Sequence, residues 1–182
     1  VPSKALIRSA KMLSYARRAK EFGFKKTDVD FDFAEVMERV QNIIGKVEPH
    51  DSEERYRDLG VDVIRGEAKI VSPWAIEVDG RTITARNLVV ATGARPFVPP
   101  IPGLDRVDYL TSDNIWQLRS LPKRLVVLGG GPIGSELTQA FARLGSRVTQ
   151  VEMAPRIMGR EDADVADYMK EKFRQDGIDV LT

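Results

Sequence analysis

Apolar side chains recur at helical spacing through the first quarter of the chain. Between Pro2 and Phe22 they fall three or four positions apart, and Gly23 is a typical C-terminal stop. A second amphipathic stretch follows Asp32, which reads as the acidic cap of a capping box. Its stripe consists of Phe33, Val36, Met37, Val40, Ile43 and Ile44. The pattern predicts two helices, the second kinked or restarted at Pro49 because proline removes a helical hydrogen bond.

The hydrophobic period changes to two after residue 60. Residues 61–65, 74–78 and 81–84 alternate apolar and polar side chains. The dipeptide Asp79-Gly80 separates the last two runs and favours a type I′ hairpin, whose central residues both need positive φ. The pattern predicts a small antiparallel meander of three strands.

A continuous apolar run at 88–92 predicts a buried strand that ends in Thr92-Gly93. Such an end can let a ligand approach the backbone, or it can simply be a strand leaving a sheet. The prolines that follow are Pro96, Pro99, Pro100 and Pro102. They mark the candidate domain boundary.

The remaining chain alternates strands and helices after a short predicted helix at 113–118. Predicted strands are 125–128, 148–152 and 178–181, and predicted helices are 133–144 and 163–175. A β-α-β-α-β order with right-handed crossovers gives a parallel sheet, which places the chain in the α/β class.

Residues 129–134 read Gly-Gly-Gly-Pro-Ile-Gly and contain the spacing G-x-G-x-x-G. The motif directly follows a predicted strand and opens a predicted helix, which is the context in which it binds a dinucleotide. Gly129 permits the tight turn, Gly131 lets the pyrophosphate approach, and Gly134 lets helix and strand pack closely. The candidate cofactor-binding residues of this loop are Gly129, Gly130, Gly131, Pro132, Ile133, Gly134 and Ser135.

Glu152 ends the second strand of this region, 18 residues after Gly134. A carboxylate there can accept hydrogen bonds from the adenosine ribose and would repel a 2′-phosphate, which favours NAD(H) over NADP(H). The plain alternative is a solvated glutamate at a strand end. Arg156 is a counter-signal, because an arginine there could tolerate a phosphate.

Composition narrows the function classes. The 182 residues contain 28 Lys and Arg, 27 Asp and Glu, and no Cys. A net charge of +1 argues against a general nucleic-acid binder, and no apolar run is long enough to span a membrane. The absence of Cys excludes disulfides, thiolate metal sites and thiol chemistry within these residues, so no metal site is predicted. Because the sequence begins at Val1 without an initiator Met and helical periodicity starts at once, we expect an internal part of a longer cytoplasmic protein.

Three separated stretches together resemble the class I pyridine nucleotide-disulfide oxidoreductases, the flavoprotein family of dihydrolipoamide dehydrogenase, glutathione reductase and mercuric reductase. They are Val1-Pro2-Ser3-Lys4-Ala5-Leu6-Ile7, then Ala91-Thr92-Gly93 with Pro96, and Gly129 to Glu136. In that family a Cys-x4-Cys pair immediately precedes the Val-Pro-Ser-Lys stretch. The resemblance implies FAD and NAD as cofactors, with NADP less favoured, and parts of two Rossmann-like dinucleotide-binding domains plus the small antiparallel meander.

The resemblance also implies roles for individual residues. Lys4 and Glu136 would form a catalytic ion pair beside the flavin N5, although an exposed lysine and a helix N-terminal carboxylate are the plain alternatives. The backbone of Ala68 would lie by the FAD adenine, and Thr92, Gly93 and Ala94 would also line the FAD. His50 matches no catalytic position of the family and is expected to be a solvated surface residue.

The resulting hypothesis divides the chain into 1–110, the latter part of an FAD domain, and 111–182, the front half of an NAD domain. Hydride would pass from nicotinamide to flavin and on to a disulfide or metal-ion substrate. The parent would be a homodimer through a C-terminal domain that is not in this sequence. Alone, the chain should be inactive, retain no FAD, and oligomerise. The rivals are a self-contained dinucleotide-binding or redox-sensing module and a relative of the NADH oxidases or ferredoxin-type reductases.

Overall fold

The computed structural model describes residues 2–182; Val1, which opens the Val-Pro-Ser-Lys stretch, lies outside them. The chain divides into two compact units. The first, here called the helix–sheet unit, comprises the residues up to Gly45 together with Ser112–Thr182. The second, the meander unit, comprises Lys46–Thr111.

Two predicted helices open the helix–sheet unit. Helix α1 spans Pro2–Arg17 and continues into a 3-10 turn, Ala19–Phe22, which stops at Gly23 in a left-handed conformation with φ +82°. Helix α2 spans Phe33–Val47, and its cap is Asp32, whose carboxylate accepts a hydrogen bond from the Ala34 N–H at 2.7 Å. A 3-10 turn, Glu48–Asp51, restarts the chain around Pro49 as predicted. Both helices are therefore confirmed, with ends that differ by a few residues.

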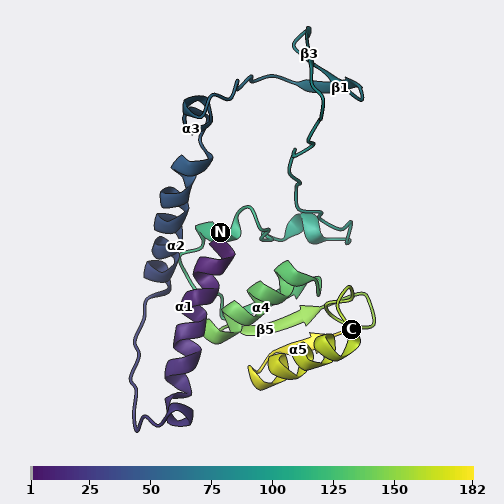
Figure 1. The fold of residues 1–182 in the computed structure, drawn as a ribbon. Coiled ribbons are helices and arrows are strands. Elements are labelled where there is room, and N and C mark those ends of the chain that lie inside the picture. Colours follow the sequence, from purple (N-terminus) through teal and green to yellow (C-terminus); the bar gives the residue numbers. More distant parts are fainter. Residues whose placement is uncertain (1) are drawn as a thin grey trace. The chain divides into compact units, whose positions relative to one another are not determined.

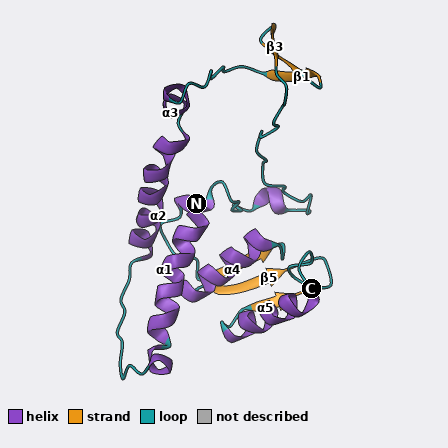
Figure 2. Ribbon diagram, viewed as in Figure 1, coloured by secondary structure: helices purple, strands orange, loops and turns teal. Residues whose placement is uncertain are grey.

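The predicted parallel sheet is confirmed as β4-β5-β6 (Figure 2). Its elements in chain order are β4 (Arg124–Leu128), α4 (Pro132–Leu144), β5 (Arg147–Val151), α5 (Ala163–Gln175) and β6 (Asp179–Leu181). β5 is the central strand: Leu128 on β4 and Leu181 on β6 both lie opposite its last residue, Val151. The short helix predicted at 113–118 is a single 3-10 turn, Ile115–Gln117.

The core of this unit lies where α1, α2 and α4 meet. Helices α1 and α4 lie side by side, although they are far apart in the sequence (Figure 1). The fully buried side chains of this core are Leu6, Met37, Val40 and Phe141 from the helices and Val148 from β5. Arg17 also ties α1 to the end of α4, because its guanidinium donates to the Arg143 carbonyl at 2.6 Å. This packing brings the start of the chain against α4.

The meander unit contains the predicted antiparallel sheet, in the order β1-β2-β3. After the short helix α3 (Glu53–Asp58) come β1 (Ala68–Ser72), β2 (Ala75–Val78) and β3 (Arg81–Thr84). Asp79 and Gly80 have φ of +48° and +80°, so the predicted turn with two positive φ values is confirmed. The 3-10 turn Leu104–Arg106 also belongs to this unit.

The prediction of a strand at 61–65 was wrong. The segment that pairs with β2 is 68–72, and Ala68 lies opposite Val78. β1 and β3 occupy the two edges of β2, and residues 61–65 pair with none of these three strands. Val61 and Ile64 are exposed accordingly.

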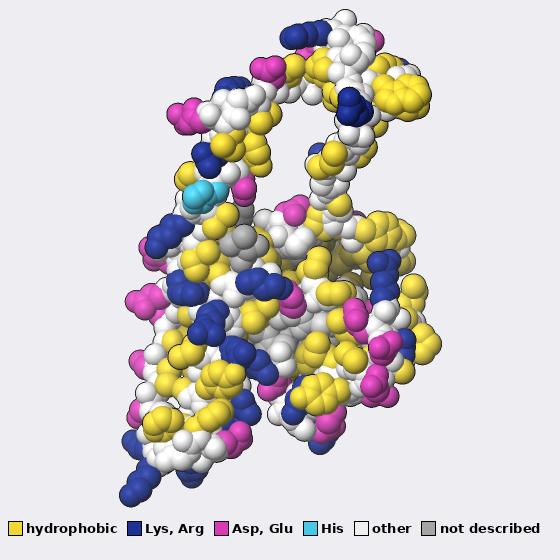
Figure 3. Space-filling view, viewed as in Figure 1, with side chains coloured by type: hydrophobic (Ala, Val, Ile, Leu, Met, Phe, Trp, Pro, Cys, Tyr) yellow, Lys and Arg dark blue, Asp and Glu magenta, His cyan; other side chains and the backbone are white. Residues whose placement is uncertain are grey.

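The predicted buried strand at 88–92 is also absent. Within residues 2–182 no segment pairs with it, and Val89 is 88% exposed. A strand needs a neighbour to complete its ladder of hydrogen bonds, and an apolar run alone does not supply one. Figure 3 shows apolar side chains open to solvent on this unit.

Pro96–Pro102 lie inside the meander unit, and the assignment of 1–110 and 111–182 to two dinucleotide domains stays a prediction. No helix in the described chain is long and apolar enough to cross a bilayer.

Candidate functional site

The glycine loop joins the end of β4 to the start of α4. Gly129 has φ +106°, a value that side chains disfavour, and its N–H donates to the Val151 carbonyl at 2.8 Å. Gly131 is the N-cap of α4, in an extended conformation and without a capping side chain, and Pro132 follows in the first turn. The loop thus presents a bare helix N-terminus, which favours an anion.

Three glycines of the loop have different surroundings. A Cβ on Gly134 would lie 2.3 Å from the Gly129 carbonyl oxygen, so only glycine lets α4 pack this close to β4. A Cβ on Gly130 would lie 2.7 Å from a methyl group of Ile157, which is buried against it. A Cβ on Gly131 would meet nothing within 4 Å, so the space beside that residue is open.

Glu152 is bound to the glycine loop rather than merely solvated. Its carboxylate accepts hydrogen bonds from the Gly130 N–H at 2.6 Å and from the Ala154 N–H at 2.7 Å. The backbone hydrogen bonds from Ala154 and Gly130 hold the pKa of Glu152 below its ordinary value of 4.5. The end of β5 therefore carries a fixed negative charge beside the loop.

Two buried polar side chains, Ser135 and Gln150, donate hydrogen bonds to carbonyls of the glycine loop. Ser135, on the first turn of α4, donates its hydroxyl to the Gly130 carbonyl at 3.3 Å. The Gln150 amide donates to the Gly129 carbonyl at 3.0 Å and to the Ser135 hydroxyl at 3.3 Å. Ser135 thus faces the interior, while Ile133 stands exposed at the surface. Sequence reasoning missed Gln150, and the available signal was an uncharged polar residue on the same strand face as the apolar Val148.

The loop that follows Glu152 folds back over the glycines. The Met158 N–H donates to the Gly130 carbonyl at 2.7 Å, and Met158 itself has φ +52°. Arg156 donates to the carbonyls of Gly159 and Glu161 at 3.3 and 3.0 Å, so its guanidinium holds its own loop. Arg156, which the sequence suggested could tolerate a phosphate, thus has its Nη2 hydrogen-bonded to two backbone carbonyls.

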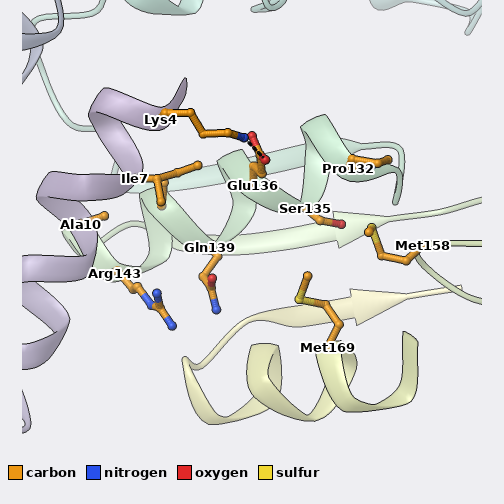
Figure 4. Close-up of a pocket in the computed structure, with 11 residues that line it drawn as sticks. Lys4, Ile7, Ala10, Pro132, Ser135, Glu136, Gln139, Arg143, Met158 and Met169 are labelled. Carbon is orange, nitrogen blue, oxygen red and sulfur yellow. Dashed lines mark hydrogen bonds and ion pairs between the residues drawn. The ribbon is translucent and has the colours of Figure 1, made fainter. Parts of the chain in front are cut away.

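The Lys4 ammonium on α1 reaches across to the Glu136 carboxylate on α4 and forms an ion pair (Figure 4). The Lys4 side chain is 69% exposed and that of Glu136 is 34% exposed, so both remain open to a ligand. The pair stands at the rim of a cavity of about 370 Å³. Its other lining residues include Ile7, Pro132, Gln139, Arg143, Met158 and Met169.

The helix–sheet unit thus brings together the glycine loop, Glu152 and the pair of Lys4 and Glu136. The candidate FAD residues lie in the meander unit: Ala68 begins β1, and Thr92, Gly93 and Ala94 are exposed in a segment without regular structure. Among those four, Gly93 has φ +72°. His50 is exposed in its 3-10 turn, and the described residues contain no cluster of three side chains suited to a metal.

Comparison with known proteins gives a consistent family signal. The family model described as pyridine nucleotide-disulphide oxidoreductase matches residues 1–182. A mercuric reductase from Staphylococcus aureus is 34% identical over 186 residues, covering 100% of this chain and 33% of that protein. A dihydrolipoyl dehydrogenase from Chlorobaculum tepidum is 36% identical over 187 residues, covering 99% of this chain and 39% of that protein.

Two solved structures are also similar to this chain. LpdA from Mycobacterium tuberculosis superposes with a TM-score of 0.74 at 31% identity, covering 100% of this chain and 41% of that one. The flavoprotein disulfide reductase RclA from Escherichia coli, in its Cu(II) complex, gives a TM-score of 0.72 at 28% identity, with 100% and 38% covered. The chain therefore spans about a third to two-fifths of the length of the proteins it resembles.

Proposed function

The chain belongs to the pyridine nucleotide-disulphide oxidoreductase family, and we propose that it supplies the NAD(H)-binding loop and part of the FAD-binding region of a flavoprotein oxidoreductase. Residues 111–182 provide the front half of the NAD domain, and residues 1–110 the latter part of the FAD domain. As in the sequence-based hypothesis, the whole protein would be a homodimer.

The observation that carries the proposal is the glycine loop with its open helix N-terminus. Gly131 leaves free space at the cap of α4, while Gly134 and Gly130 are closely packed beneath it. A pyrophosphate placed beside Gly131 meets the backbone directly and gains from the helix dipole. The residues present therefore fit a dinucleotide.

Glu152 supports NADH as the preferred dinucleotide. Its depressed pKa keeps the side chain ionised at neutral pH. An ionised carboxylate can accept hydrogen bonds from a ribose diol, whereas it repels the 2′-phosphate of NADPH. The Arg156 Nη2 already donates to the Gly159 and Glu161 carbonyls, so a 2′-phosphate would compete with these two hydrogen bonds for that nitrogen.

Lys4 and Glu136 are proposed as the catalytic pair. When bound, nicotinamide and flavin supply hydride and electron transfer between donor and substrate. The Lys4 ammonium stabilises negative charge that develops next to it, and the Glu136 carboxylate orients that ammonium. Electrons would leave to a disulfide or metal-ion substrate through thiols. Because the 182 residues contain no Cys, they would be inactive toward such substrates alone.

Titration calorimetry on the full-length protein tests the proposal. NADH should bind more tightly than NADPH by roughly 5- to 30-fold, which corresponds to about 1–2 kcal/mol at a partly exposed site. Glu152→Ala should narrow this ratio, whereas Glu171→Ala, the same charge change on the exposed face of α5, should leave it unchanged. Equal or tighter binding of NADPH by the unaltered protein would contradict the role of Glu152. Binding of neither nucleotide would refute the proposal.

A further inference from the structure

We propose that Gln150 is a positioning residue for the dinucleotide: its buried amide holds the glycine loop in the shape that receives the pyrophosphate. The inference rests on the function proposed above and adds to it a residue outside the glycine motif. Gln150 is the next-to-last residue of β5, the central strand of the parallel sheet, and its side chain is fully buried. It cannot touch a ligand in the open space beside Gly131, so it acts through the loop.

The first peptide group of the loop is held from both sides. Its carbonyl, on Gly129, accepts the Gln150 amide at 3.0 Å, and its N–H, on Gly130, donates to the Glu152 carboxylate at 2.6 Å. A peptide group is planar, with its C=O and N–H pointing in opposite directions. Gln150 and Glu152 together therefore fix the orientation of this plane.

The second peptide group is held by a relay. The Gly130 carbonyl accepts the Ser135 hydroxyl at 3.3 Å and the Met158 N–H at 2.7 Å. Ser135 in turn accepts the Gln150 amide at 3.3 Å, which orients the serine hydroxyl (Figure 4 shows Ser135 on the first turn of α4). With the Gly130 carbonyl held inward, the trans peptide turns the Gly131 N–H the opposite way. A single amide thereby aligns two successive peptide groups at the helix N-terminus.

Stability alone does not account for a glutamine at this position. Val148, two residues earlier on the same face of β5, is fully buried and apolar, as is usual in a central strand. The Gln150 Oε1 is buried and has no hydrogen-bond partner among the described residues. An unfilled buried acceptor destabilises the fold, so an apolar side chain would suit the strand better. What the glutamine adds is the alignment of the loop carbonyls.

The test is Gln150→Met in the full-length protein, which keeps a similar side-chain length and removes the donor. Calorimetric titration should show NADH and NADPH both weakened about tenfold, because the pyrophosphate is common to them. The ratio of the two affinities should stay unchanged, in contrast to Glu152→Ala. Steady-state kinetics should show a raised KM for NADH with little change in kcat.

Thr138→Val is the matched control. Thr138 is also fully buried on α4, and its hydroxyl has no partner among residues 2–182 and no hydrogen bond to the loop. Its replacement should leave both affinities unchanged. Ser135→Ala is the second variant, should Gln150→Met fold poorly: it breaks the relay while keeping the contact between Gln150 and Gly129, so it should weaken both nucleotides less.

The outcomes distinguish a failure of the proposed function from a failure of the positioning role of Gln150. If the unaltered protein binds neither nucleotide, the proposed function fails. If it binds NADH and Gln150→Met binds equally well, the positioning role is overturned and the function stands. The role is also overturned if the variant changes the ratio between NADH and NADPH, or if Thr138→Val weakens binding as much as Gln150→Met does.

Discussion

Adding a single methyl group at Gly134 should destabilise the protein, while the same change at Gly131 should not. The Cβ of Gly134→Ala would lie 2.3 Å from the Gly129 carbonyl oxygen. Because a relaxed carbon–oxygen contact is about 3.3 Å, α4 and the end of β4 would have to separate by about 1 Å. The atom in the way is backbone, so no side-chain rotation relieves the contact.

The expected magnitude follows from two opposing effects. Overpacking of this kind costs about 1–3 kcal/mol, and replacing glycine by alanine inside a helix recovers about 1 kcal/mol. The net loss should be up to about 2 kcal/mol in the free energy of unfolding. For a cooperative unit of 150–250 residues, a loss of about 2 kcal/mol corresponds to a fall in Tm of roughly 4–8 °C.

Gly131→Ala is the matched control for stability and the opposite test for binding. Gly131 has φ −75°, which alanine adopts freely, and its Cβ would meet nothing within 4 Å. Urea melts followed by circular dichroism should therefore show Gly131→Ala unfolding like the parent, while calorimetry shows NADH binding weakened by the methyl group at the pyrophosphate position. A Gly134→Ala protein as stable as the parent, or a Gly131→Ala protein that binds NADH normally, would refute this explanation of the glycine spacing.

Three further predictions address the charged residues. The pKa of Glu152 is depressed in the folded protein, so the stability that this carboxylate contributes is present above about pH 4.5 and is lost as the pH falls through the folded pKa. Urea melts at acid pH should show that Glu152→Gln loses less stability than the parent over this pH range. Asp176 accepts the Arg143 guanidinium at 3.0 Å in a largely buried pair, so Asp176→Ala should lower the free energy of unfolding by about 1–3 kcal/mol, and an unchanged urea midpoint would contradict this. Lys4→Met removes an exposed ion pair to Glu136 and should change stability by only about 0–1 kcal/mol, yet slow flavin reduction by NADH roughly 10- to 100-fold in stopped-flow measurements.

The helices and the parallel sheet could be predicted because local signals and tertiary packing agree there. Gly23 ends a helical turn, Asp32 caps a helix, and Gly134 allows the close contact between α4 and β4. Each of these requirements is local in sequence, so residue type and spacing express it directly.

The two wrong strands show what a local pattern omits. Residues 61–65 and 88–92 have suitable side chains, but a strand also requires a neighbour in register, and sequence alone does not name that neighbour. In the meander the strand that pairs with β2 is 68–72, with Ala68 opposite Val78.

Gln150 was missed for a related reason. Its role depends on carbonyls of a loop about 20 residues earlier in the chain, which become its neighbours only once β4 and β5 pair. Similarly, the sequence suggested Glu152 as a ribose acceptor, while its hydrogen bond to the Gly130 N–H emerged only from the fold. Contacts between distant segments decide such roles, and they need a three-dimensional structure.

Whether this chain supplies the NADH site of a flavoprotein is tested most directly by anaerobic flavin reduction in the full-length, FAD-loaded protein, with NADH and NADPH compared in a stopped-flow spectrophotometer. NADH should bleach the flavin absorbance band, and should do so at lower concentration than NADPH because Glu152 favours the unphosphorylated ribose. A folded protein whose bound flavin keeps its spectrum on mixing with NADH would overturn the proposed function.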